Sequence, residues 1–215
     1  MSKFPSILTA LSFVFLSTAS LADEYGQFSG IPKVHLPDDG RSLILLEEFS
    51  YTDRYSRNWS VRAGYEADGA SIPSIFWSFI GGPLSGKYRN ASILHDYFCE
   101  YRGPSSDQVH TMFHEAMLAG GVPERKAWIV YKAVDVFGKN WEIVEENVPD
   151  ECKAGEGFDP SKCVFNDAMA VVDTTIEATP ERLETFFADL SEQGYADEVL
   201  ELREAAKAAG MHVIE

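Results

Sequence analysis

The sequence has few cysteines, a shortage of positive charge and, after its N-terminal leader, no long apolar run. Its formal net charge of −16 over 215 residues argues against binding to nucleic acids or anionic membranes, which requires a basic face. No segment after the leader approaches the roughly 18 consecutive apolar residues of a membrane span. The His-Glu-x-x-His zinc motif and its inverted form are both absent. Composition therefore predicts an acidic globular protein and identifies no reaction.

The first 22 residues have the pattern of a signal peptide. Lys3 supplies a positive charge, residues 4–16 are predominantly apolar, and Ser20 and Ala22 are the small residues of a cleavage site. We predict cleavage after Ala22 and a periplasmic or secreted mature protein. The alternative is an uncleaved N-terminal anchor.

Export would place the three cysteines where disulfides persist. Cys152 and Cys163 flank a short glycine-containing stretch, so we predict a disulfide between them. Cys99 follows His95 by one helical turn. We interpret it as a buried thiol of the core, with a role as a metal ligand as the alternative.

The hydrophobic pattern predicts an α+β fold, with a core domain over residues 23–147 and a disulfide-pinned linker with an acidic helical extension over 148–215. Residues 28–67 read as strands of one small antiparallel sheet packed with a helical bundle, because apolar residues alternate with polar ones and turn residues separate them. Residues 145–215 hold 18 acidic and 5 basic residues. We interpret this charge as solvated surface rather than an interaction tail.

Helical periodicity and capping residues predict five helices. A helix from residue 87 ends at the Gly103-Pro104 pair, and Ser105 with Gln108 forms a capping box for the next. The remaining predicted helices run from about Pro123 to Gly138, from Thr179 through Leu190, and from Tyr195 to Ala209.

The predicted helix from residue 87 and the helix that follows it carry side chains that can bind metals. Histidine and carboxylate are ligands of Zn²⁺ and similar divalent ions, and His110 and His114 are spaced to project from one helix face. His95 and Asp96 would approach from the preceding antiparallel helix. We predict a divalent metal, zinc among the candidates, held by His95, Asp96, His110 and His114. Asp68 and Asp96 are the predicted catalytic residues, and the alternative is a set of hydrogen-bonded structural side chains.

These motifs together resemble a known family. The turn Asp68-Gly69-Ala70-Ser71-Ile72-Pro73, the Leu94-His95-Asp96-Tyr97 segment, the Phe113-x-x-Ala116-Met117 helix and residues 131–141 are similar to the domain of unknown function 1353 family of bacteria and phages. The resemblance covers residues 28–141. It implies a compact mixed α and β domain in which the Asp68 turn lies beside the His95-Asp96 pair, and it implies no established activity.

One position departs from the family pattern. Family members usually carry aspartate where this chain has His110. Replacing a carboxylate by an imidazole keeps a metal ligand but alters the preferred metal.

Two functions follow as hypotheses. The first is an exported metal-dependent hydrolase that acts on an envelope substrate such as peptidoglycan. The second is a non-catalytic periplasmic binding or immunity-like protein, whose histidine cluster is structural and whose acidic helices face a protein partner. A weaker third hypothesis, a His-Asp phosphohydrolase, would need His35 and Asp135 as additional ligands.

Overall fold

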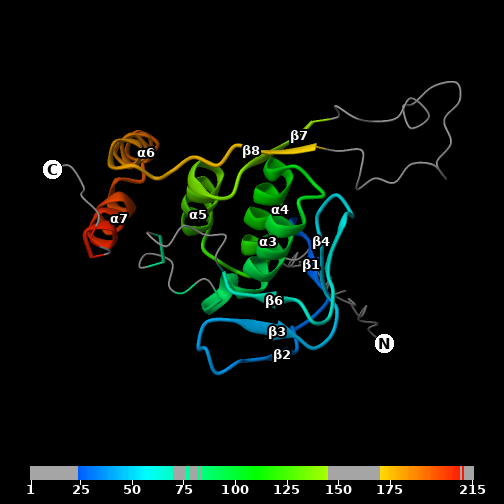
Figure 1. Cartoon of the computed structure of the whole chain (residues 1–215). Coiled ribbons are helices and arrows are strands. Elements are labelled where there is room, and N and C mark those ends of the chain that lie inside the picture. The colour runs from blue at the N-terminus through cyan, green and yellow to red at the C-terminus, as the bar shows by residue number, and fades with distance from the viewer. Residues whose placement is uncertain are drawn as a thin grey trace, which may run out of the picture.

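The structure is a computed structural model that describes residues 24–69, 76–77, 82, 84–144, 170–208 and 210. Small antiparallel sheets and a helical bundle make up an α+β fold (Figure 1). The predicted class is therefore confirmed. In the described part of the chain, no helix combines the length and apolar character that crossing a membrane requires.

The N-terminal strands form two sheets rather than the single sheet predicted. One has the order β1 (Gln27–Phe28), β4 (Phe49–Thr52), β5 (Asn58–Val61), and the other β2 (Val34–His35), β3 (Leu43–Leu45), β6 (Glu66–Ala67). All the pairings are antiparallel. The strands β3 and β4 each use both edges within their own sheet, so the two sheets cannot merge through them.

The β4–β5 hairpin is closed by one buried carboxylate. Asp53 accepts hydrogen bonds from the backbone of Tyr55 and Arg57 and from the indole of Trp59. An aspartate that bonds the backbone two residues on is typical of tight turns. The turn sets the register that places Tyr51 opposite Trp59, and both rings are buried, as the alternation of apolar residues predicts.

Three helices follow: α3 (Arg89–Tyr101), entered through the 3-10 turn η2 (Gly86–Tyr88), α4 (Ser106–Ala119) and α5 (Glu124–Phe137). The predicted capping box is present, because Ser105 and Gln108 each bind the backbone of the other. The α4 helix is the centre of the bundle and packs against both α3 and α5. Its apolar stripe is fully buried: Val109, Met112, Phe113, Ala116 and Met117.

Beyond α5 the chain forms β7 (Trp141–Val144), which pairs with β8 (Ala170–Asp173). The hydrophobic pattern of the sequence did not predict this pair of strands. Two further helices, α6 (Pro180–Glu192) and α7 (Ala196–Ala208), match the predicted positions. They lie across α5 from the two small sheets (Figure 1), and Phe186 of α6 contacts Phe137 and Phe76.

Candidate metal centre

The connection between α3 and α4 brings two of the predicted ligands together. Arg102 ends α3 in the left-handed conformation, and the capping box starts α4 four residues later. This short turn makes the two helices antiparallel neighbours. His95 and His110 face each other across the interface, with ring centroids 5.3 Å apart. Their side chains are 1% and 0% exposed.

Cys99 lies close to both histidines. It stands one turn after His95 on α3, and its sulfur lies 3.5 Å from His95 Nε2. One ligand atom from each of His95, Cys99 and His110 lies within 4.8 Å of the other two. Zinc bonds of about 2.0–2.1 Å to nitrogen and 2.3 Å to sulfur, at a tetrahedral angle, separate the two ligand atoms by about 3.6 Å. The observed contact therefore fits joint coordination, as well as a thiol–imidazole hydrogen bond.

Both imidazoles are held in the neutral form that metal ions bind. Burial lowers the pKa of His95 well below its usual value, and His110 and Lys139 act in the same direction. Burial also lowers the pKa of His110, although Asp135, the Lys139 backbone and Asp107 oppose it. Neither ring nitrogen of His110 has a hydrogen bond of ordinary geometry within the described residues. Leaving a buried polar group unpaired costs about 1–3 kcal/mol, and a metal ion would offset that cost.

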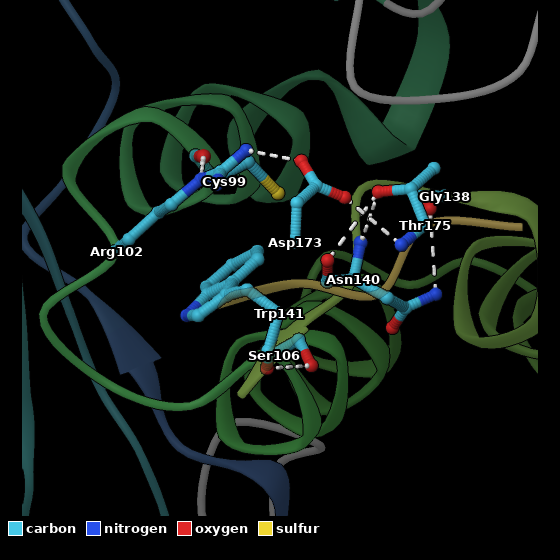
Figure 2. Close-up of polar contacts among 8 residues, drawn as sticks. All are labelled: Cys99, Arg102, Ser106, Gly138, Asn140, Trp141, Asp173 and Thr175. Atoms are coloured by element: carbon cyan, nitrogen blue, oxygen red, sulfur yellow. Dashed lines mark hydrogen bonds and ion pairs between the residues drawn. The ribbon is translucent and has the colours of Figure 1, made fainter. Parts of the chain in front are cut away.

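The strand β7 closes one side of this group. Trp141 stands edge-on to the His110 ring, with centroids 6.4 Å apart. Figure 2 shows how Trp141 is fixed: Ser106 donates a hydrogen bond to its backbone carbonyl at 2.9 Å, and Arg102, next to Cys99 in the view, pairs with Asp173 at 3.2 Å. The indole donates to the Pro104 carbonyl. Residues beyond α5 thus cover the α3–α4 interface.

Asp96, a predicted ligand and catalytic residue, has a different local environment. Its carboxylate accepts hydrogen bonds from the backbone N–H groups of Asp68 and Gly69 at 3.0 and 2.8 Å. The structure thereby brings Asp68 and Asp96 together, as the resemblance implies, through the backbone of Asp68. Asp68 also lines a cavity of about 450 Å³ with Ser42, Trp77 and Arg89. Residues 70–75 of the predicted turn lie outside the described residues.

His114 lies apart from the other two histidines. It contacts Trp128 and Tyr131 of α5, with ring centroids 5.8 and 5.1 Å away. Burial, reinforced by Arg54, lowers its pKa to about 4. The two residues of the weaker phosphohydrolase hypothesis are also separate: His35 is exposed on β2, and Asp135 pairs with Lys132 at 3.1 Å.

The structure therefore assembles His95, Cys99 and His110 as the group able to hold a metal within the described residues. Cys99 was interpreted from the sequence as a core thiol, and its spacing of four residues from His95 is the signal that could have identified it. Its side chain is 1% exposed. The predicted partners of the disulfide, Cys152 and Cys163, lie outside the described residues.

Comparison with known proteins adds a family and no activity. Residues 43–134 match the family described as "Protein of unknown function (DUF1353)". The chain is 40% identical over 141 residues to the uncharacterized protein y4jT of Sinorhizobium fredii, covering 64% of this chain and 42% of that protein. It is 33% identical over 124 residues to the uncharacterized protein y4iH of the same organism, covering 57% and 51%.

The chain thus spans about half the length of these curated relatives or less. No solved structure matches it.

Proposed function

We propose that this protein, whose residues 43–134 belong to the DUF1353 family of unknown function, is an exported hydrolase. Its activity would depend on a zinc-like ion held between α3 and α4. The observation that carries this proposal is the buried His95–Cys99–His110 group. Two imidazoles and one thiolate suit zinc among the divalent metals, since calcium and magnesium prefer oxygen ligands.

Three ligands from the described residues favour catalysis over a purely structural ion. Structural zinc sites are closed by four protein ligands, whereas catalytic sites have three and keep the fourth position for water or substrate. In that position zinc supplies the Lewis acidity that activates water near neutral pH. In this chain the neutral rings of His95 and His110 would bind through a lone pair, and Cys99 would lose its proton on binding.

The setting of the site supports hydrolysis of an envelope substrate. The N-terminal leader predicts export, and the strongly acidic chain does not suit a nucleic-acid substrate. Asp96 directly follows His95 on α3, and its carboxylate is fixed by the Asp68 and Gly69 amides.

One observation favours the second hypothesis, a non-catalytic binding protein. His95, Cys99 and His110 are each 1% exposed or less, and they do not line the three cavities of about 450, 560 and 240 Å³ that described residues form. A closed group of this kind suits an ion, or a hydrogen-bonded cluster, that stabilises the α3–α4 interface. Metal binding and substrate turnover therefore have to be measured separately.

The first experiment measures metal binding. Elemental analysis of the purified mature protein should find one ion per chain. Thermal melting with and without chelator should show that wild type loses stability on chelation and that His95→Ala and Cys99→Ser hardly respond. A double variant should lose little beyond the worse single variant, because one missing ligand already disables the site. His35→Ala, on an exposed strand position, is the matched control and should respond like wild type.

The second experiment measures activity. Zinc-loaded protein incubated with purified peptidoglycan should release soluble fragments, and chelation should abolish the release. Stoichiometric metal without turnover of any envelope substrate would favour the non-catalytic hypothesis. Absence of metal together with identical melting in chelator would contradict both the metal centre and the hydrolase.

A further inference from the structure

We propose that a second site, on the face of α4 that packs against α5, binds a small organic cation with a primary ammonium group. The site is a cavity of about 240 Å³ between α4, α5, the β4–β5 hairpin and the N-terminal segment. It shares no residue with the His95–Cys99–His110 group, so the two proposals stand or fall separately. The residues that carry it are Arg54, His114, Glu115, Glu124, Trp128 and Tyr131.

Buried polar atoms with few hydrogen-bond partners line this cavity. The Glu115 side chain is 3% exposed, and its Oε1 lies 2.7 Å from Arg54 Nη2 in an ion pair. Neither carboxylate oxygen has a hydrogen bond of ordinary geometry within the described residues, nor does Nε2 of His114. Buried polar atoms are almost always hydrogen-bonded in folded proteins. A ligand that brings N–H donors would satisfy the carboxylate and an acceptor nitrogen of the neutral imidazole together.

Aromatic rings form the wall beside these atoms. Trp128 and Tyr131 stand on one face of α5 with ring centroids 5.5 Å apart, and Tyr25 lines the cavity as well. A cation within about 6 Å of such ring faces is attracted by their electron density. The fold already uses this attraction, because the Lys132 ammonium lies 5.4 and 5.2 Å from the two ring centroids.

The charges of the lining select the sign of the ligand. Two carboxylates, Glu115 and Glu124, line the cavity against one guanidinium, that of Arg54. The nearby Lys132 is matched by Asp135. A monovalent cation would therefore balance the lining, and the net charge of −16 raises the local concentration of cations. An anion or a neutral molecule gains neither effect.

Protonation of the two buried groups agrees with this assignment. Burial raises the pKa of Glu115, although Arg54 and Arg57 lower it and Asp53 raises it further. Burial lowers the pKa of His114 to about 4, so the ring is neutral at neutral pH. Binding of a cation favours the ionised carboxylate, and we therefore expect affinity to increase with pH through the titration of Glu115.

The test is calorimetric titration of the full mature chain with n-butylammonium, with 1-butanol and butyrate as neutral and anionic counterparts. We expect a ligand of about five non-hydrogen atoms to bind with a Kd on the order of 1 mM, well short of the tightest binding possible at this size. We expect saturable binding of butylammonium near that value and no saturable binding of the other two. Nα-acetyl-lysine methylamide presents the same ammonium on a peptide: stronger binding than butylammonium identifies a polypeptide cation, and weaker binding a free amine.

Variants identify the cavity. Glu115→Gln should weaken butylammonium binding about tenfold or more, because it removes a charged acceptor. Glu66→Gln, an equal charge change at an exposed position on β6, should leave binding unchanged. If Glu115→Gln does not fold, Trp128→Leu decides the question and should weaken binding about two- to fivefold.

Three results would overturn the proposal: equal affinity for butanol, unchanged affinity in a folded Glu115→Gln or Trp128→Leu variant, or absence of saturable binding. The last would mean that Glu115 needs no partner beyond Arg54 and water.

Discussion

Lowering the pH from about 7 to about 5 should destabilise the metal-free protein through its buried histidines. Burial lowers the pKa of His95, His110 and His114 below the usual histidine value. The unfolded chain then binds protons at a pH where the folded rings remain neutral. Stability is complete above the unfolded pKa of about 6.5 and is lost as the pH falls from there toward the folded values.

The size of the effect follows from the unfolded pKa. At about pH 5 an unfolded histidine has taken up nearly one proton, so each ring that stays neutral lowers the free energy of unfolding by at most about 2 kcal/mol. His95 and His110 are almost fully buried, and together they set a limit of about 4 kcal/mol. His114 is partly exposed, so solvent reduces its share. Total stability is typically 5–15 kcal/mol, which makes the loss readily measurable.

Other titrating groups act outside this range or with the opposite sign. The lowered pKa values of Asp39, Asp53 and Asp173 cost stability only near and below the unfolded aspartate pKa of about 3.9. The raised pKa values of Glu100 and Glu115 add stability as the pH falls. Comparing histidine variants with wild type therefore isolates the histidine contribution to the free energy of unfolding better than measuring wild type alone.

Urea unfolding in chelator, followed by tryptophan fluorescence at about pH 7, 6 and 5, gives the free energies. His110→Gln should reduce the loss between pH 7 and 5 by up to about 2 kcal/mol, whereas His35→Gln, at an exposed position, should leave it unchanged. A wild-type loss below about 1 kcal/mol, or an equal loss in His110→Gln, would refute the assignment of neutral buried rings.

Three further predictions concern other parts of the chain. Gly120→Ala should destabilise the fold by about 1–3 kcal/mol in chemical unfolding, because a Cβ there would lie 2.7 Å from the Lys87 carbonyl oxygen; unchanged stability would contradict this close approach. Non-reducing peptide mapping should link Cys152 to Cys163, and a link from either to another cysteine would make the pairing wrong. Mass spectrometry of exported protein should show cleavage after Ala22, and an intact N-terminus would argue for the anchor instead.

The helices were predictable because residues close in sequence determine where each helix begins and ends. Ser105 with Gln108, and Thr179 before Pro180, satisfy or remove the backbone donors that a helix start leaves unpaired. These signals act within a few residues. Pairing of β7 with β8 depends instead on segments separated by residues 145–169, and nothing in either four-residue strand specifies its partner. Local patterns therefore predicted the helices and missed this hairpin.

The candidate site was predictable in part for a similar reason. The short α3–α4 turn made contact between His95 and a histidine of α4 predictable. A spacing of four residues rotates a helical side chain by about 40° and moves it about 6 Å along the axis. On a helix packed on two sides, that difference places His110 against α3 and His114 against α5. The packing of the helices determines which neighbouring helix each histidine contacts, and sequence spacing alone does not predict it.

The strand β7 also shows that the bounds of the family match differ from the bounds of the packed structure around the histidine cluster. The match to the family model ends at residue 134, inside α5, yet the ring that shields His110 belongs to Trp141. Before the match begins, β1 supplies an edge of the first sheet. A fragment limited to residues 43–134 would lack β1 and Trp141, and its histidine cluster would be open to water. The smallest segment that can be expected to keep water from the histidine cluster is therefore longer than the segment that the family model matches.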